Sequence, residues 1–347
     1  MAEAGGRRAR VERLLAAARE LPGDASLARR LVDTTGLSPA NVEIGLQRCL
    51  ETHVSPEDLA SLLESTPESS TAHVLLSANV FVAALRAIAI GVASSPRVMV
   101  RPSRRDPALA EALHALAPEL FALVPRLEPA RGEHLWSYGS DGTMAELRAS
   151  LPEGVWLHAH GAGFGAVVLS PASLTRDTAR AVALDTALFD QRGCASPRVV
   201  CVVGGVERAQ SVAKALAEAL RELEVELPPG ERGAVELAEL RRSRDAAAYA
   251  FELFDAGRGW VSVSDRVVIP PAERSLHVVA CPDPSSALRP FAAHLTCVAC
   301  NDASFQGALR QAFPGARVVA PGDMQRPVLD GPVDRRHGTR GELIRCS

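Results

Sequence analysis

Apolar residues recur along this chain at two spacings, and each spacing predicts a kind of element. From residue 1 to about 70 they follow helical spacing, and Ser38 and Ser55, each followed by proline, are typical helix starts. From about 71 to 185, short apolar runs such as HVLLS, RVMVRPS and HLWSYGS alternate with Ala- and Leu-rich stretches. Strands separated by helical stretches of about ten to fifteen residues predict crossover units and a doubly wound parallel sheet.

A second α/β pattern follows the first. VVCVVGGVERAQSVAKALAEALRELEVEL reads as strand, loop and amphipathic helix, and SLHVVACPD and HLTCVACND read as further strands. The last residues are broken by prolines and too poor in apolar side chains to fold alone. We therefore expect an α/β protein in four segments: a helical segment 1–70, two α/β domains at 71–185 and 186–320, and a tail 321–347.

Composition and charge narrow the classes of partner. The chain of 347 residues has a net charge of -3, so nothing favours nucleic acid or an anionic membrane as its partner. The apolar run 73–93 is interrupted by Asn79 and Arg86, and a strand followed by a buried helix explains it without a membrane span. Seven scattered cysteines predict no disulfide framework and favour a reducing cytoplasm.

Four loops after the predicted strands of 71–185 are candidates for ligand binding. They read SANVF, RPSRRDP, YGSDGT and HGAGFG, and each is small, polar or rich in glycine. Open parallel sheets bind ligands at the carboxyl ends of their strands, where such loops let the backbone approach a phosphate or ribose. The GxGxxG fingerprint of dinucleotide-binding domains does not follow the first strand, so the loops alone support a cofactor site only weakly.

The spacing in HLTCVAC also suggests a metal site, through His294, Cys297 and Cys300. A zinc site needs four ligands, and the sequence offers no second pair at a suitable distance. We therefore predict no metal.

Several motifs, taken in chain order, resemble one known family. SANVFVAALRAIAIGVASSPRVMVRPSRRDP, YGSDGTMAELRASLPEGV, HGAGFGAVVLS, FDQRGCASP and RVVAPGDMQRPVLDGPVD are similar to the acyl-CoA reductases of the bacterial bioluminescence type. These fatty-acid reductase subunits have the aldehyde dehydrogenase fold. The resemblance implies that 71–185 binds a dinucleotide and that 186–320 carries a catalytic cysteine.

The resemblance also implies three catalytic residues. Cys194 matches the cysteine that attacks the acyl thioester, and a thiolate on a glycine-flanked loop suits that role. The alternative is a buried structural cysteine. Asn79 matches the asparagine that stabilises the oxyanion together with the backbone N–H of the cysteine, although it also suits a simple turn. His160 is a candidate proton donor.

The implied cofactor is NADPH. The family has lysine where this chain has Arg101, and the guanidinium groups of this loop favour a 2′-phosphate over a free hydroxyl. A solvated basic turn is the alternative, and Asp141 is a candidate N-cap for the next helix. The implied cofactor-binding residues are Arg101, Pro102, Ser103, Arg104, Gly139, Ser140 and Gly161.

The expected reaction is the NADPH-dependent reduction of a fatty acyl-CoA, or of an acyl-carrier thioester, to an aldehyde. HAHGAGFG lacks the glutamate with which aldehyde-oxidising relatives activate water, and this absence favours reduction. The sequence leaves open a noncatalytic interaction subunit with the same fold, an acyl-donating partner protein and a homo-oligomer.

Overall fold

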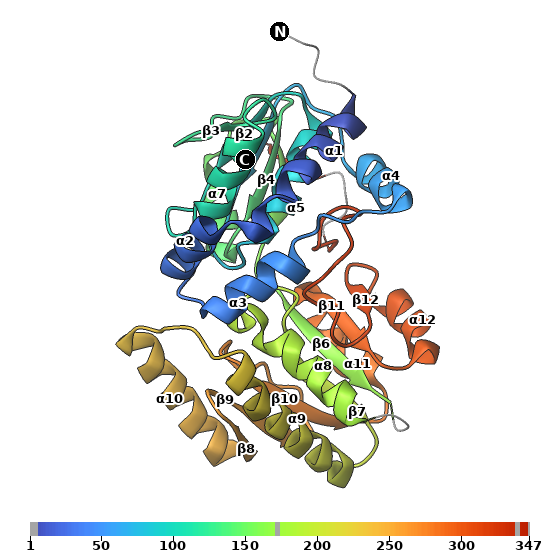
Figure 1. The fold of residues 1–347 in the computed structure, drawn as a ribbon. Helices are drawn as coiled ribbons and strands as arrows, with labels where there is room; N and C mark the ends of the chain where they lie inside the picture. The colour runs from blue at the N-terminus through green and yellow to red at the C-terminus, as the bar shows by residue number, and fades with distance from the viewer. Residues whose placement is uncertain (1–5, 171–173, 337–340, 346–347) are drawn as a thin grey trace. The chain divides into compact units, whose positions relative to one another are not determined.

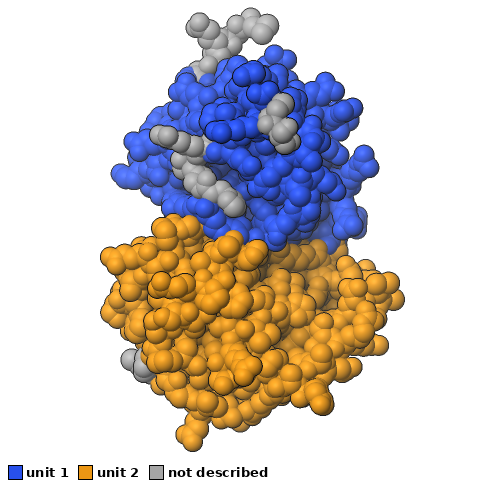
Figure 2. Space-filling model, turned by 180° about the vertical axis from the view of Figure 1, so that it is seen from behind, with its two compact units in different colours: residues 1–35, 42–162, 326–347 blue, residues 36–41, 163–325 orange. Residues whose placement is uncertain are grey.

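The computed structural model describes residues 6–170, 174–336 and 341–345, and it confirms the predicted α/β class. Two sheets of mainly parallel strands are accompanied by helices (Figure 1). The chain forms two compact units, coloured separately in Figure 2. Unit 1 comprises residues 1–35, 42–162 and 326–347, and unit 2 comprises residues 36–41 and 163–325.

Unit 1 contains a sheet in the order β13-β5-β4-β1-β2-β3, in which β13 alone runs antiparallel to its neighbour. Its strands are β1 (Ala72–Leu75), β2 (Val98–Arg101), β3 (Ala122–Leu123), β4 (His134–Tyr138), β5 (Trp156–His160) and β13 (Glu342–Leu343). The connecting helices are α5 (Ala83–Ser94), α6 (Ala108–Leu116) and α7 (Asp141–Ser150).

Helix α5 explains the apolar run that raised the question of a membrane span. Its residues from Leu85 to Ser94 are all buried, and apart from Arg86 and Ser94 they are apolar or glycine. Gly91 lets the helix approach the sheet, because a Cβ there would lie 2.9 Å from Val74 and 3.0 Å from Val98. Within the described ranges, no helix combines the length and the apolar character needed to cross a bilayer.

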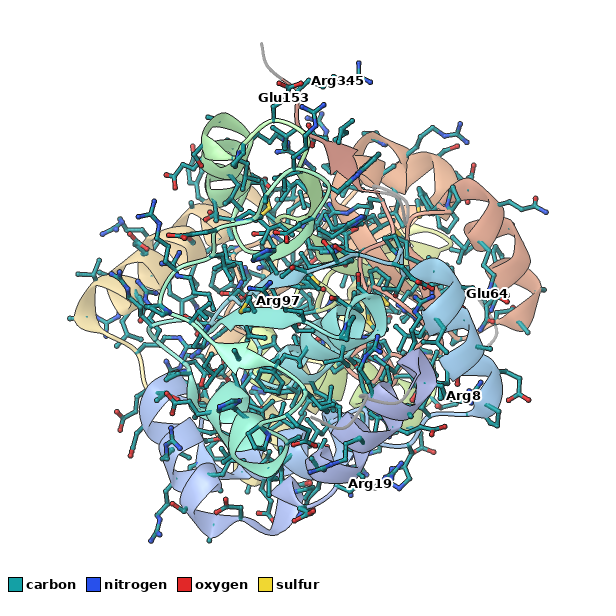
Figure 3. All side chains as sticks on the ribbon, turned by 90° about the horizontal axis from the view of Figure 1, so that it is seen from above. Arg8, Arg19, Glu64, Arg97, Glu153 and Arg345 are labelled. Atoms are coloured by element: carbon teal, nitrogen blue, oxygen red, sulfur yellow. The ribbon has the colours of Figure 1, made fainter. Side chains whose placement is uncertain are left out.

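The described part of the range 1–70 is rich in helices, as the apolar spacing predicted. It contains α1 (Arg7–Ala18), α2 (Ala25–Thr35), α3 (Pro39–Ile44), a π-helical turn (Gly45–Cys49) and α4 (Pro56–Ser65), with a short 3-10 turn at Leu21–Gly23. Ser55 caps α4 as predicted, since its side chain accepts a hydrogen bond from the Asp58 N–H. Charged side chains such as Arg8, Arg19 and Glu64 lie at the surface of these helices (Figure 3).

Unit 2 contains a sheet in the order β12-β11-β6-β7-β10-β9-β8, parallel except for the β8–β9 pair. Its strands are β6 (Phe164–Leu169), β7 (Pro197–Val203), β8 (Glu252–Ala256), β9 (Gly259–Ser264), β10 (Leu276–Cys281), β11 (Leu295–Cys300) and β12 (Arg317–Val319). Its helices are α8 (Arg176–Ala187), α9 (Val206–Glu226), α10 (Ala234–Ala250), α11 (Pro284–Leu288) and α12 (Ala303–Ala312), with 3-10 turns η3 (Leu188–Gln191) and η4 (Arg289–His294).

The units divide the chain differently from the four predicted segments. The apolar stretch 155–169 forms two strands, β5 in the sheet of unit 1 and β6 in the sheet of unit 2. Residues 163–185, which we expected in the first α/β domain, therefore lie in unit 2, and most of the tail after residue 325 lies in unit 1. The four-segment division stays a prediction about domains.

Candidate active site

Cys194 lies in unit 2, on the loop between η3 and β7. The loop closes as a tight turn, in which the Ser196 N–H donates to the Gly193 carbonyl at 3.0 Å. Cys194 is half-buried, whereas the other described cysteines, Cys49, Cys201, Cys281, Cys297 and Cys300, are buried. Among the described thiols, that of Cys194 is therefore the best placed to meet a substrate.

Two of the buried thiols of unit 2, those of Cys297 and Cys300, have a raised pKa. Burial, with the nearby Asp185 carboxylate, raises the pKa of Cys297 far above its usual value. Burial also raises the pKa of Cys300. These shifts favour the neutral thiol, which is a poor nucleophile.

Three consecutive residues ahead of the loop have a left-handed backbone. Phe189, Asp190 and Gln191 have φ values of 53°, 49° and 61°. This conformation costs roughly 1 kcal/mol or more for each residue with a side chain. The chain can hold such a turn only if other contacts stabilise it.

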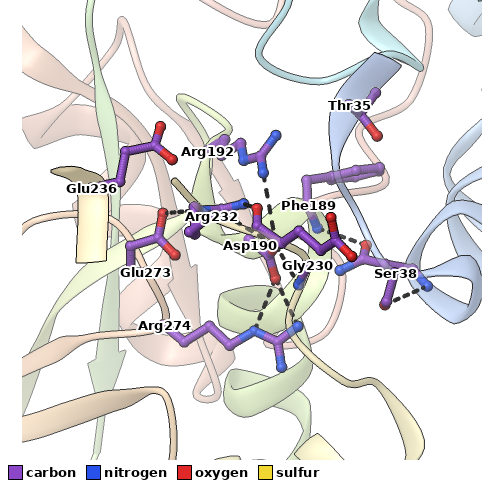
Figure 4. A network of polar contacts seen from close by, with 12 residues as sticks. Thr35, Ser38, Phe189, Asp190, Arg192, Gly230, Arg232, Glu236, Glu273 and Arg274 are labelled. Atoms are coloured by element: carbon purple, nitrogen blue, oxygen red, sulfur yellow. Dashed lines mark hydrogen bonds and ion pairs between the residues drawn. The ribbon is translucent and has the colours of Figure 1, made fainter. Parts of the chain in front are cut away.

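Asp190 makes one set of these contacts, although its side chain is only 1% exposed. Its carboxylate accepts hydrogen bonds from Arg274 at 2.8 and 3.1 Å, from Arg232 at 3.2 Å and from the Gly230 N–H at 3.0 Å. Figure 4 shows these donors converging on the Asp190 carboxylate, with Arg192 further away at 3.9 Å. A buried carboxylate needs such donors, because an unpaired buried charge is costly.

Gln191 makes a second set of contacts. Its side-chain N–H groups donate to the carbonyls of Pro197 at 2.6 Å and Ser275 at 2.7 Å. Its side-chain oxygen accepts from the Ser275 N–H at 2.9 Å. The buried amide therefore ties the chain ahead of Cys194 to the start of β7 and to the residue that precedes β10.

The residues that follow Cys194 are held by neighbouring strands. Thr296 of β11 donates a hydrogen bond to the Cys194 carbonyl, and the Gly165 N–H of β6 donates to the Ser196 carbonyl at 2.8 Å. A Cβ at Gly165 would overlap the carbonyl oxygen of Ala195, so this close approach requires glycine. Both halves of the Cys194 loop are thus anchored within unit 2.

The remaining predicted site residues lie in unit 1, after four parallel strands. Asn79 lies on the loop after β1, Arg101 to Arg104 begin at the end of β2, Gly139 and Ser140 follow β4, and His160 and Gly161 end β5. The strands lie side by side in the order β5-β4-β1-β2. Because they are parallel, the structure brings these residues to one edge of the sheet, where such sheets bind ligands.

The loop after β2 carries guanidinium groups that form no ion pair within the described part of the chain, while Asp106 in the same loop is buried and accepts a hydrogen bond from Thr34. Arg101 is half-buried and Arg104 is exposed, and neither forms an ion pair with any described acidic residue. Ser103, half-buried like Pro102, accepts a hydrogen bond from the Arg105 N–H at 3.2 Å. The free guanidinium groups suit an anionic ligand.

The turns after β4 and β5 are joined to each other. The Gly139 N–H donates to the His160 carbonyl at 3.1 Å, and the Asp141 carboxylate accepts from the Ala162 N–H at 2.9 Å. A Cβ at Gly161 would overlap that carboxylate. The expectation that Asp141 caps α7 is wrong: Ser140 is the N-cap, accepting from the Thr143 N–H, and Asp141 instead holds the neighbouring turn.

His160 is nearly buried, and neither ring nitrogen has a hydrogen-bond partner among the described residues. Its ring stacks on Tyr138 at 4.7 Å, and Nδ1 lies 3.9 Å from the Asp334 carboxylate. Burial raises the pKa of Asp334, but hydrogen bonds from Arg336 outweigh it and hold that pKa well below its usual value. An ionised carboxylate therefore lies beside an imidazole that can still bond to a ligand.

Sequence reasoning missed the residues that support the candidate site. Arg232 and Arg274 lie 42 and 84 residues from Asp190 in the chain, and no local motif marks them as its partners. Asp334 lies in the GPVD stretch that the family resemblance marked, without a role. In the described part of the chain, no group of three or more His, Cys, Asp or Glu side chains could hold a metal ion.

The comparison with protein families gives one match. The model described as acyl-CoA reductase (LuxC) matches residues 130–328, more than half of the chain. This range includes the Cys194 loop and the turns after β4 and β5. A search of curated proteins found no match.

Solved structures share the fold at low sequence identity. An oxidoreductase from Marinobacter aquaeolei has a TM-score of 0.71 and 10% identity, over 97% of this chain and 84% of that chain. An NAD-dependent benzaldehyde dehydrogenase from Corynebacterium glutamicum has a TM-score of 0.68 and 14% identity, over 93% of this chain and 83% of that chain. A putative methylmalonate-semialdehyde dehydrogenase from Sinorhizobium meliloti 1021, complexed with NAD, has a TM-score of 0.66 and 14% identity, over 92% of this chain and 78% of that chain. These matches confirm the aldehyde dehydrogenase fold.

Proposed function

Because this chain belongs to the acyl-CoA reductase (LuxC) family, we propose that it reduces a fatty acyl thioester to an aldehyde through an acyl group carried on Cys194. Membership of the family makes the chain an oxidoreductase that acts on aldehyde or acyl groups. The observation that carries the finer proposal is the Cys194 loop: a half-buried thiol on a turn anchored on both sides, among described cysteines that are otherwise buried.

Cys194 performs the covalent step. Its thiolate sulfur attacks the carbonyl carbon of the thioester, a carbon–sulfur bond to Cys194 forms, and the bond to the carrier sulfur breaks. The carrier leaves as a thiolate that takes up a proton. When the acyl carbon is later reduced, the bond to Cys194 breaks and the sulfur leaves as a thiolate, ready for another acyl group.

Two other side chains are assigned supporting roles. The Asn79 amide and the Cys194 backbone N–H donate hydrogen bonds to the oxygen that becomes negative during attack. His160 donates the proton to the departing thiol. The ring nitrogens of His160, which accept or donate no hydrogen bond among the described residues, support this role.

The carboxyl edge of the unit 1 sheet fits a nicotinamide cofactor. Its turns approach so closely that Gly161 has no space for a Cβ, and the proposed cofactor-binding residues lie on the loops after β2, β4 and β5, three of four neighbouring parallel strands. Arg101 and Arg104 would hold the 2′-phosphate of NADPH, with Pro102 and Ser103 shaping their loop, and Gly139, Ser140 and Gly161 would hold the pyrophosphate. NADPH supplies the hydride that reduces the acyl carbon.

The test is to transfer a mass-tagged acyl group from an acyl-CoA to the protein and to identify the residue that carries it. We expect purified protein incubated with mass-tagged palmitoyl-CoA, without NADPH, to carry one acyl group on the peptide that contains Cys194. Addition of NADPH should release the label as the aldehyde. Cys194→Ser should lose both the label and the activity, while Cys49→Ala, which changes a buried cysteine, should retain both.

Other outcomes would count against the proposal. A label on a different cysteine would reject Cys194 as the nucleophile. Absence of any label, with palmitoyl-CoA and with acyl-carrier thioesters of graded length, would instead support a noncatalytic interaction subunit that retains the fold.

A further inference from the structure

We propose that Asp190 and Arg274 are positioning residues for Cys194. Their buried ion pair holds residues 189–191 of η3 in the left-handed conformation, and the loop that carries Cys194 follows directly after them. The inference rests on the proposed role of Cys194. Neither side chain reaches the substrate in this proposal, because both act by fixing the backbone four residues ahead of the sulfur.

The backbone conformation of the chain supports this inference. In the described residues, positive φ values occur at five positions that are not glycine. Three are Phe189, Asp190 and Gln191, and the other two are Glu273 at 99° and Arg274 at 61°. All five thus lie on two segments that the Asp190–Arg274 ion pair joins. Strain confined to one place, next to the candidate nucleophile, indicates a functional constraint on that place.

The ion pair is buried and linked to further segments. Asp190 and Arg274 are each only 1% exposed. Arg274 also donates to the Leu227 carbonyl at 2.7 Å, and Arg232 joins Asp190 to Glu273 with a 2.6 Å contact. The turn is therefore held against the chain after α9 and against the segment that leads into β10.

Packing leaves these segments little freedom to move. A Cβ at Gly259 would overlap the Arg274 carbonyl oxygen, and a Cβ at Gly230 would lie 2.9 Å from the Asp190 carboxylate. On the other side of η3, the Phe189 N–H donates to the Asn41 side chain at 2.9 Å. Loss of the charge on Asp190 leaves Arg274 buried without its anion, which is costly. We expect residues 189–191 to respond by leaving the left-handed conformation, because the ion pair no longer holds them there.

A set of variants separates the charge from the backbone. Asp190→Asn removes the charge but keeps a residue that tolerates the left-handed conformation, whereas Asp190→Ala removes both. Asp255→Asn is the matched control, because it removes the exposed Arg244–Asp255 ion pair of the same unit. Arg274→Lys is a milder change, which keeps the charge but loses the two-point contact with Asp190, and it is used if the Asp190 variants do not fold.

Three measurements are made on each variant: the rate at which iodoacetamide alkylates Cys194 as a function of pH, trypsin cleavage after Arg192, and kcat and KM with acyl-CoA and NADPH. A misplaced reacting group loses about 10- to 100-fold in rate. We expect losses of about this size in kcat and a clear change in the alkylation profile for Asp190→Asn, with larger losses for Asp190→Ala. In the Asp190 variants, trypsin cleavage after Arg192 should accelerate, and KM for NADPH should stay at the wild-type value. The control Asp255→Asn should match the wild type in all three measurements.

A folded Asp190→Asn protein with wild-type alkylation, cleavage and kcat would overturn the inference. If the Asp190 variants do not fold, a folded Arg274→Lys protein with wild-type values does the same. Alkylation needs neither acyl-CoA nor NADPH, so the two proposals fail separately. If wild-type protein accepts no acyl group while Asp190→Asn changes the reactivity of Cys194, the proposed function fails and the positioning role stands.

Discussion

At the scale of single residues, two contrasts bear on the chemistry of this protein: some thiols are buried and one is accessible, and some arginines are paired with acids and others are not. Burial raises the pKa of Cys297 and Cys300, so that neither supplies a thiolate readily, whereas the Cys194 loop leaves its thiol half-exposed. The arginines of the loop after β2 differ from several arginines elsewhere in unit 1 in having no ion-pair partner in the described chain. Arg13 and Arg30 pair with glutamates, but Arg101 and Arg104 have no acidic partner among the residues that the structure describes.

These free guanidinium groups lead to a prediction about cofactor choice. In Arg101→Ala and Arg104→Ala, KM for NADPH should rise about tenfold, because each variant loses a charge-assisted contact to the 2′-phosphate. Values with NADH should change little. Steady-state kinetics with both cofactors test this, and Arg126→Ala, an exposed arginine elsewhere in unit 1, is the control. An equal loss with NADPH and NADH would reject the 2′-phosphate as the ligand.

At the scale of elements, helix α5 secures the tail of the chain through one buried side chain. Arg86 donates to the carbonyls of Pro327 at 2.9 Å, Val328 at 2.7 Å and Gly331, and it pairs with Glu51 at 2.9 Å. The tail is poor in apolar residues, although Leu329 and Ile344 are buried. Polar contacts to α5 therefore add to the apolar packing that holds the tail. These bonds explain how the QRPVLDG stretch is held without a helix or strand of its own.

Arg86→Met should therefore destabilise unit 1 and loosen the tail. The variant leaves three carbonyls without this donor and Glu51 without its cation, and we expect a loss of about 3 kcal/mol or more in the free energy of unfolding. Chemical denaturation measures the loss, and trypsin cleavage after Arg335 measures the loosening. Arg13→Met, which removes an exposed ion pair, should cost about 1 kcal/mol or less. Equal effects of the two variants would contradict the anchoring role.

At the scale of the whole molecule, stability should depend on pH through two buried histidines of unit 1. His134 Nδ1 and His158 Nε2 share a 2.8 Å hydrogen bond, and the His158 ring stacks on Trp136 at 4.4 Å. Burial lowers the pKa of His134 to about 4, and burial together with the charges of His134 and His160 lowers that of His158 to about 3. Both rings are therefore neutral in the folded protein.

The sign of the pH effect follows from these shifts. Below the unfolded pKa of about 6.5 the unfolded chain binds protons that the folded chain does not, so stability falls as the pH falls from about 7 towards 4. At pH 5 each imidazole should cost about 2 kcal/mol. Urea denaturation at several pH values measures this loss. His158→Gln should flatten the dependence, whereas a change of the exposed His53 to Gln should not; a His158→Gln profile as steep as that of the wild type would refute the assignment.

Much of the fold could be read from local patterns. The strands β1, β2, β4, β7, β10 and β11 and the helices α5, α6, α7 and α9 lie where the apolar spacing predicted them. Helix α10 was missed because only Leu240 of its residues is buried, so it has no apolar stripe to detect. Strands β5 and β6 were read as parts of one domain because two adjoining apolar runs do not reveal that they join different sheets.

The candidate reactive groups are a local property of this sequence, because a cysteine between glycine and a small-residue turn, or arginines after a strand, can be recognised within a few residues. Their environment is not local. Asp190 meets Arg274 across 84 residues, and His160 meets Asp334 across the tail, so only folding reveals these partners. The tertiary structure decided which thiols are buried, which charges are paired and which backbone turn is strained, since each depends on atoms brought from distant parts of the chain.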